Sequence, residues 1–123
     1  MFQQSVFGKS AWTFNARRGQ YYLHQFYEEQ PDLNLRNPKV VTELTEALKF
    51  WLDLGVDGFR VDAVGHFFED ESLADEGPSS DGGSGYQSLL HDKTYDQDEV
   101  IDLLKVFRQV LDEATAADET NPR

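Results

Sequence analysis

The chain has 123 residues, 39% of them hydrophobic and 13% aromatic, which is enough for the core of one ordinary domain or part of a larger one. Its formal net charge of −12 argues against a nucleic-acid partner, because phosphate backbones are bound by Lys and Arg surfaces. The absence of cysteine excludes a disulfide framework and a thiolate metal site.

Aromatic side chains are concentrated in residues 5–27. Ala11 to Phe14 and Gln20 to Phe26 are predicted as two short strands around a polar turn from Asn15 to Gly19. Two interpretations remain open for the rings. They pack in a hairpin core, which the usual burial of aromatic residues favours, or they form platforms beside a ligand pocket, on which a sugar can stack.

A loop and then a helix are predicted next. Residues 30–34, Gln-Pro-Asp-Leu-Asn, favour an extended or turning loop. The helix begins with Asn37 as N-cap and Pro38 at the first helical position, and Gly55 ends it. Spacings of three and four predict one buried apolar stripe, formed by Val40, Val41, Leu44, Ala47, Leu48, Trp51 and Leu52.

Residues 58–64 are predicted to form a strand directly after this helix, the arrangement of a parallel α/β unit. Side chains alternate along a strand, so Arg60 and Asp62 would point to one side. Phe59, Val61 and Ala63 would pack on the other. A parallel strand needs a partner on each side and the sequence offers none, so we expect a piece of a larger α/β protein.

After this strand the composition changes. Residues 69–85 are rich in Asp, Glu, Gly and Ser, and few could be buried, which predicts a long, mobile surface loop. Its carboxylates lack the ligand spacing of an EF-hand loop. Residues 95–99 lead into a second helix, after which residues 114–123 are expected to trail off. Its predicted stripe is Val100, Ile101, Leu103, Leu104, Phe107, Val110 and Leu111.

The predicted strand also carries the candidate chemistry. A guanidinium beside a carboxylate keeps it ionised and aimed, so Asp62 with Arg60 suits a nucleophile or an electrostatic stabiliser. A structural ion pair is nearly as well supported by the residues alone. His66 either donates a hydrogen bond to a ligand or packs at the strand end. His24 and His91 lack the spacing that would form a zinc site with it.

Two segments resemble signatures of the α-amylase family of glycoside hydrolases (glycoside hydrolase family 13). Residues 58–66, Gly-Phe-Arg-Val-Asp-Ala-Val-Gly-His, are similar to its strand-four signature. Residues 30–34 are similar to the signature near the end of its inserted domain B, in the form found in oligo-glucosidases and maltases. Together with the surrounding sequence from about Val6 to Glu113, the chain most resembles insect maltase-type α-glucosidases.

The resemblance implies an α/β fold that is part of a (β/α)8 TIM barrel. Residues 1–36 would be the end of domain B. Residues 37–123 would be a partial catalytic barrel: its third helix, its fourth strand, the following loop and its fourth helix. No signal peptide or apolar run of roughly 20 residues is visible, so membrane anchoring would require segments outside this sequence. The resemblance implies a secreted or cell-surface location.

The resemblance also implies residue roles. Asp62 is expected to be the catalytic nucleophile of a retaining mechanism, with Arg60 orienting it and His66 lining the sugar site. Ala63 is the small residue associated with α-1,4 preference, and Phe67 and Phe68 would face the pocket entrance. No metal or cofactor is expected in this segment. Calcium would be held only elsewhere in a full enzyme.

The expected function is that of a fragment of an α-glucosidase. It would hydrolyse terminal α-1,4-linked glucose from maltose, sucrose or short oligosaccharides, with a small oligosaccharide as its partner. The family's general acid, a glutamate on the fifth strand, is absent, so the chain alone is expected to be inactive and poorly folded.

Two alternatives remain. One is a non-catalytic relative that acts as a cell-surface partner, such as an amino-acid transporter heavy chain or a toxin receptor. Those transporter chains tend to lose the arginine or the catalytic carboxylates, so the intact Arg60 and Asp62 favour the enzyme. The other is a structural domain with an Arg–Asp ion bridge, which the paired signatures disfavour.

Overall fold

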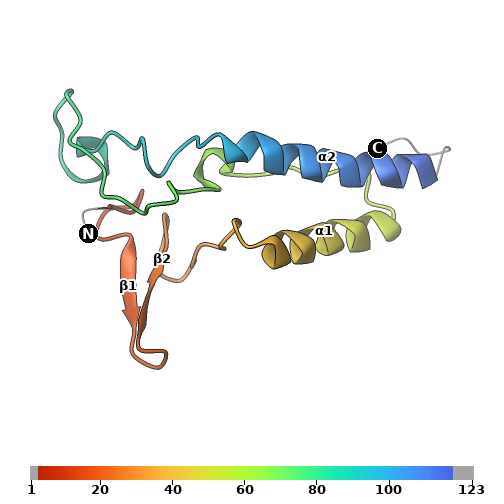
Figure 1. Ribbon diagram of the computed structural model, residues 1–123, viewed down its shortest axis with the longest axis horizontal. Helices are drawn as coiled ribbons and strands as arrows, with labels where there is room; N and C mark the ends of the chain where they lie inside the picture. Colours follow the sequence, from red (N-terminus) through yellow and green to blue (C-terminus); the bar gives the residue numbers. More distant parts are fainter. Residues whose placement is uncertain (1–2, 118–123) are drawn as a thin grey trace.

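A computed structural model describes residues 3–117 and shows a β-hairpin at one end and two long helices side by side at the other (Figure 1). A long loop connects the second helix to the rest of the chain. The elements in chain order are β1 (Trp12–Asn15), β2 (Gln20–Leu23), α1 (Pro38–Asp53), the 3-10 turns η1 (Val64–His66) and η2 (Gly85–Ser88), and α2 (Glu99–Ala117).

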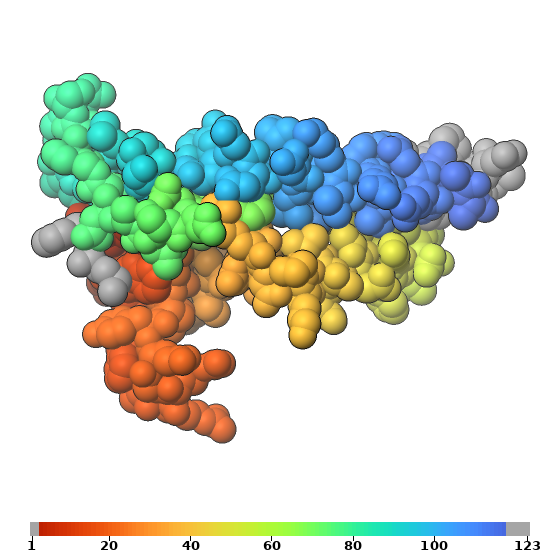
Figure 2. Space-filling model, viewed as in Figure 1, coloured from red at the N-terminus to blue at the C-terminus, as the bar shows by residue number. Residues whose placement is uncertain are grey.

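The predicted hairpin is confirmed. β1 and β2 pair antiparallel, with Trp12 opposite Leu23 and Asn15 opposite Gln20. The expectation that the aromatic rings pack in a hairpin core is wrong for four of them, because each is more than half exposed: Phe7, Phe14, Tyr21 and Tyr27. Among residues 3–117 the hairpin is the only sheet, and it projects from the rest of the molecule (Figure 2). It therefore has no second layer against which the rings could be buried.

The predicted bounds of α1 are confirmed by its caps. The Asn37 side chain accepts a hydrogen bond from the Lys39 N–H at 3.0 Å. At the other end Gly55 has φ 94°, which allows the Gly55 N–H to bond the Leu52 carbonyl at 2.9 Å. The Val56 N–H bonds the Trp51 carbonyl at 3.1 Å, which completes a Schellman motif.

The two helices lie side by side, but the core between them is thin (Figure 1). Buried residues are Leu52 on α1 and Val100, Leu103 and Val110 on α2. The prediction of a buried stripe on each helix is therefore wrong at Trp51, which is 51% exposed, at Ile101, which is 57% exposed, and at Ala47, which is also exposed. The main cluster joins Phe68 to Val100 and Leu103.

The strand predicted over residues 58–64 does not form. Residues 56–62 have no regular secondary structure, and the chain then enters η1. A strand is held by hydrogen bonds to a neighbouring strand, and within the described part of the chain none lies beside this segment. From the end of α1 the segment turns back and runs behind α2 towards η1 (Figure 1).

The long loop after η1 is held by hydrogen bonds and contains one buried carboxylate. Leu90 N–H bonds the Gly77 carbonyl at 3.0 Å, and Pro78 and Leu89 form an isolated bridge. Glu76 is only 7% exposed, and its carboxylate accepts a hydrogen bond from the Thr94 hydroxyl at 2.6 Å. Glu76 is the single buried residue between positions 69 and 85, so the expectation of few buried residues is confirmed, and composition gave no sign that a carboxylate would be the exception.

The second helix extends further than predicted. It continues through residues 114–117, which were expected to trail off, because alanine-rich sequence has high helix propensity. The remainder of that expectation, residues 118–123, lies outside the described residues. Neither α1 nor α2 combines the length and apolarity that a bilayer span requires.

Candidate functional site

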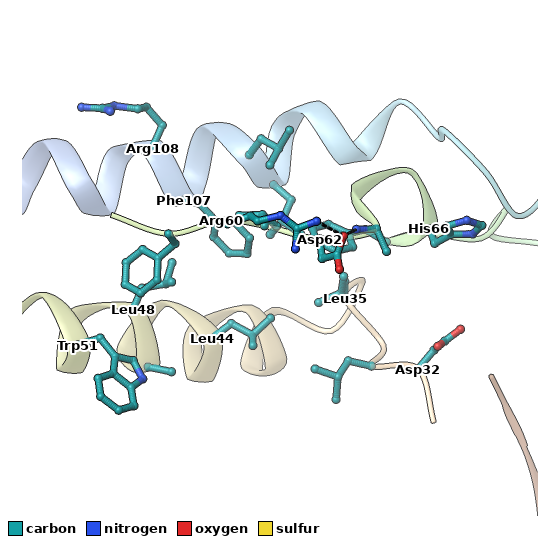
Figure 3. A pocket seen from close by; sticks show the side chains of 18 of the residues that line it. Asp32, Leu35, Leu44, Leu48, Trp51, Arg60, Asp62, His66, Phe107 and Arg108 are labelled. Carbon is teal, nitrogen blue, oxygen red and sulfur yellow. Dashed lines mark hydrogen bonds and ion pairs between the residues drawn. The ribbon is translucent and has the colours of Figure 1, made fainter. Parts of the chain in front are cut away.

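Arg60 and Asp62 form the predicted pair. Arg60 Nη2 donates to Asp62 Oδ1 at 3.0 Å, drawn as a dashed line in Figure 3. The two side chains are 82% and 75% exposed, so solvent screens the pair and its contribution to stability is about 0–1 kcal/mol. The contact therefore orients the carboxylate more than it stabilises the fold.

The backbone turns sharply directly after Asp62. Ala63 has φ 51° and ψ 34°, a left-handed conformation that costs a non-glycine residue about 1–2 kcal/mol. The Ala63 N–H donates to Asp62 Oδ1 at 3.1 Å, so this oxygen accepts two hydrogen bonds. Strained backbone next to a reactive group is typical of functional sites. No sequence pattern indicated this conformation, since alanine rarely adopts it.

His66 lies farther along the same segment and is half-buried. In Figure 3 its ring points away from the Arg60–Asp62 pair. The ring is edge-on to Phe26 and to Tyr95, with centroids 5.1 and 4.9 Å away. Burial holds the pKa of His66 below its usual value of 6.5, and the charge of His91 lowers it further. The neutral imidazole is therefore favoured.

Sequence reasoning missed Gln25, which connects the hairpin side to the segment after Asp62. It is 3% exposed, and its Oε1 lies 2.7 Å from His66 Nδ1. Its Nε2 donates to the His66 carbonyl at 3.1 Å and to Glu69 Oε1 at 2.8 Å. Its backbone N–H donates to Asp32 Oδ2 at 2.9 Å. A single glutamine at a strand end carries no local signal for such contacts.

Two carboxyl groups therefore converge on Gln25. Burial raises the pKa of Asp32 to about 7, although the Gln25 N–H opposes the shift; the charge of Glu69 also raises it. Burial likewise raises the pKa of Glu69, against the hydrogen bond from the Gln25 amide and the charge of Arg36. Among residues 3–117 no group of three or more His, Cys, Asp or Glu side chains could hold a metal ion together.

A groove of about 1010 Å³ collects the candidate residues (Figure 3). Arg60, Asp62 and His66 all line it. Much of the rest is apolar and comes from the inner sides of the two helices and the aromatic segment, including Phe26, Leu44, Leu48, Trp51, Leu103 and Phe107. The Arg–Asp pair is thus a polar patch at an apolar groove, accessible to a ligand.

The two phenylalanines after His66 differ from expectation. Phe67 lines the groove, whereas Phe68 is 6% exposed and belongs to the core. The Arg36 guanidinium lies over its ring, 5.4 Å from the centroid. The prediction that both rings face a pocket entrance is wrong for Phe68, because the chain after η1 turns it towards α2.

Comparisons with known proteins identify the family of the chain. The family model of the α-amylase catalytic domain matches residues 2–120. An α-glucosidase of Culex pipiens is 54% identical over 113 residues, which are 91% of this chain and 20% of that protein. A salivary α-glucosidase of Anopheles gambiae is 46% identical over 121 residues, 93% of this chain and 20% of that protein.

Two further similarities are informative. The human amino acid transporter heavy chain SLC3A1 is 46% identical over 114 residues, 89% of this chain and 17% of that protein. The crystal structure of an α-glucosyl transfer enzyme, XgtA, superposes with a TM-score of 0.82 at 38% identity, over 91% of this chain and 23% of that one. The chain spans about a fifth of the length of the curated relatives it matches.

The fold is thus that of part of an α-amylase-type α/β catalytic domain. The chain belongs to the α-amylase family of glycoside hydrolases, and the relatives that it matches include proteins named α-glucosidase.

Proposed function

We propose that this chain supplies the nucleophile segment of a retaining α-glucosidase acting on maltose, sucrose or short oligosaccharides with terminal α-1,4-linked glucose. The observation that carries the proposal is the exposed Asp62 carboxylate, hydrogen-bonded by Arg60 at 3.0 Å beside the groove. The 54% identity to a mosquito α-glucosidase supports the choice of substrate class. The active protein is the full-length polypeptide that contains this sequence, called the full-length protein below.

In the proposed mechanism a carboxylate oxygen of Asp62 attacks the anomeric carbon of the glucose. A bond forms between that oxygen and the carbon as the bond to the glycosidic oxygen breaks. A general acid outside this chain protonates the departing oxygen. Water then attacks the anomeric carbon and gives a proton to the same acid/base residue, which breaks the glycosyl ester and regenerates both the Asp62 carboxylate and the acid. Arg60 orients Asp62 for the attack, and His66 contacts the sugar.

The proposed domain division follows the family. Residues 1–36, which include the projecting hairpin, end domain B, and residues 37–123 belong to the barrel. α1 and α2 would be its third and fourth helices, and residues 58–64 its fourth strand. The apolar groove supports this arrangement, because the neighbouring strands of a barrel would cover its helix-lined part. We further propose a secreted or cell-surface location, supported by the relative named salivary.

A second candidate function is that of a non-catalytic cell-surface partner. It is favoured by the 46% identity to the human transporter heavy chain. The two candidates differ in one measurable respect, since only the enzyme releases glucose.

The decisive experiment is Asp62→Asn in the full-length protein, assayed by glucose release from maltose. Loss of the nucleophile is expected to lower kcat by on the order of 10³-fold or more. Stability should be unchanged, because the side chain is 75% exposed. Asp53→Asn, at the exposed end of α1, is the matched control and should keep full activity.

Retained turnover in Asp62→Asn would refute the assignment of the nucleophile. A folded wild-type protein that releases no glucose from any of these sugars would favour the non-catalytic candidate. The isolated 123-residue chain is expected to be inactive, since it lacks the second carboxyl group of the reaction.

A further inference from the structure

The Gln25 amide bridges two parts of the chain that are far apart in sequence. Its Nε2 reaches the His66 carbonyl, 41 residues away, and the Glu69 carboxylate, 44 residues away. Its Oε1 faces the His66 imidazole at 2.7 Å from Nδ1. All three contacts come from one side chain that is almost fully buried. Water therefore does not compete for them.

These contacts determine how the amide is oriented. A backbone carbonyl can only accept a hydrogen bond, so the amide atom beside the His66 carbonyl must be the nitrogen. The Glu69 carboxylate favours the same orientation. The amide oxygen is then the atom beside His66 Nδ1, and it too can only accept. The hydrogen of that contact must be carried by Nδ1.

A neutral imidazole carries one hydrogen, and the partner of one nitrogen decides the state of the other. With the hydrogen on Nδ1, Nε2 has a free lone pair. Within residues 3–117 no polar partner contacts Nε2, whereas the ring faces are flanked by Phe26 and Tyr95. Histidine in water prefers the opposite tautomer, with the hydrogen on Nε2, so the protein must impose this one.

We propose that Gln25 is a positioning residue that holds His66 as the Nδ1–H tautomer, so that Nε2 accepts a hydrogen bond from a hydroxyl of the sugar. His66 lines the same groove as Asp62, and its ring points away from the Arg60–Asp62 pair, so the proposed hydroxyl lies farther along the groove than the bond that Asp62 attacks (Figure 3). The choice of a sugar hydroxyl rests on the proposed function, whereas the tautomer follows from the contacts alone.

The tautomer can be measured directly in the full-length protein labelled with 15N-histidine. Long-range 1H–15N correlation at neutral pH distinguishes a protonated from an unprotonated ring nitrogen. The His66 signals are those that vanish in His66→Asn. The expected result is a protonated Nδ1 and an unprotonated Nε2. An Nε2–H tautomer in the wild-type protein would overturn the proposal.

Variants at Gln25 separate positioning from general packing. Gln25→Leu removes the acceptor and should shift His66 towards the Nε2–H tautomer. Gln25→Glu keeps an acceptor beside Nδ1 but loses both amide donors, so it should preserve the Nδ1–H tautomer. Gln3→Leu is the matched control, because Gln3 is 2% exposed and bonds Trp12 and the Ala74 carbonyl, away from His66.

An unchanged His66 tautomer in a folded Gln25→Leu protein contradicts the proposal, as does a shift of equal size in Gln3→Leu. If Gln25→Leu fails to fold, the wild-type and Gln25→Glu spectra still decide the tautomer.

Kinetics test the sugar contact separately. In Gln25→Leu we expect KM for maltose to rise about five- to tenfold with a smaller change in kcat, as for one lost neutral hydrogen bond in substrate binding. Gln25→Glu should recover part of this loss. An unchanged KM with a shifted tautomer would refute the hydroxyl contact. A wild-type protein without hydrolase activity would defeat the proposed function, and the tautomer would still be measurable.

Discussion

Gly65 is the residue at which a single added carbon has the clearest consequence. A Cβ at this position would lie 2.5 and 2.6 Å from Cε2 and Cζ of Tyr95, and 3.0 Å from its hydroxyl oxygen. Ordinary van der Waals contacts of a Cβ are 3.4–4 Å. Gly65→Ala must therefore displace the Tyr95 ring by up to about 1 Å. That ring packs edge-on against His66, so the change also disturbs the candidate site.

The expected cost follows from three contributions. Overpacking costs about 1–3 kcal/mol, and the lower end applies because Tyr95 is 48% exposed and its ring can swing towards solvent. Loss of the aromatic pair with His66 adds about 0.5–1.5 kcal/mol. Alanine also lowers the conformational entropy of the unfolded chain, which stabilises the folded state by about 0.4–1 kcal/mol. This gain applies because Gly65 is not among the glycines with positive φ. The net destabilisation is about 1–2 kcal/mol.

A double-mutant cycle isolates the steric clash between the added Cβ at position 65 and the Tyr95 ring. In a Tyr95→Ala background the ring is absent, so Gly65→Ala should be neutral or slightly stabilising, and the coupling energy should be about 1–2 kcal/mol. Equilibrium urea unfolding of the full-length protein, followed by circular dichroism, measures all four corners. Gly58→Ala is the control, because no atom lies within 4 Å of its added Cβ. An equal cost of Gly65→Ala in both backgrounds would show that the Tyr95 ring is not the cause.

Two further predictions concern buried charge. The folded-state pKa of Asp32, about 7, lies above its ordinary value of 3.8, so its stabilising contribution is complete below pH 3.8 and is lost as pH rises through 7. The full shift corresponds to about 4 kcal/mol, which solvent screening of this partly exposed group reduces to about 1–2 kcal/mol. Between pH 4 and 8 the unfolding free energy of Asp32→Asn should fall less with rising pH than that of the wild-type protein. An equal fall in both proteins would count against the buried-carboxyl explanation. In the long loop, His91 Nδ1 lies 3.2 Å from Glu76 Oε2, so His91→Leu removes the polar neighbour of this buried oxygen, leaves the carboxylate with Thr94 alone and should cost about 1–3 kcal/mol. The Leu90 N–H bonds the Gly77 carbonyl, so faster hydrogen exchange at the Leu90 amide in His91→Leu would report local opening of the loop. Adding Glu76→Gln to His91→Leu should partly restore slow exchange. Unchanged exchange in His91→Leu would contradict the prediction.

Features that depend on neighbouring residues were predictable from the sequence. The bounds of α1 follow from Asn37, Pro38 and Gly55, whose capping effects act within a few residues. The Arg60–Asp62 contact is equally local, since the two residues are two apart. The family resemblance came from short contiguous segments and is confirmed by the match over residues 2–120. The catalytic role of Asp62 and the substrate roles of Arg60 and His66 stay predictions.

Features that depend on distant partners were not predictable. The segment from 58 to 64 has strand-like sequence, yet a strand exists only when another strand pairs with it. Glu76 has the composition of a surface loop, yet Thr94 and His91 allow it to be buried. The left-handed Ala63 is likewise imposed by its surroundings, because alanine alone avoids that conformation.

The sequence by itself therefore determined the helices, the hairpin, the family and the pairing of Arg60 with Asp62, all through short-range geometry or contiguous signatures. Only the tertiary structure decided how His66 is held, because Gln25 reaches it from 41 residues away and Tyr95 from another segment. Burial, the partner of each polar atom and the protonation of an imidazole depend on what the fold brings together. Those properties are consequently not encoded in any local stretch of the chain.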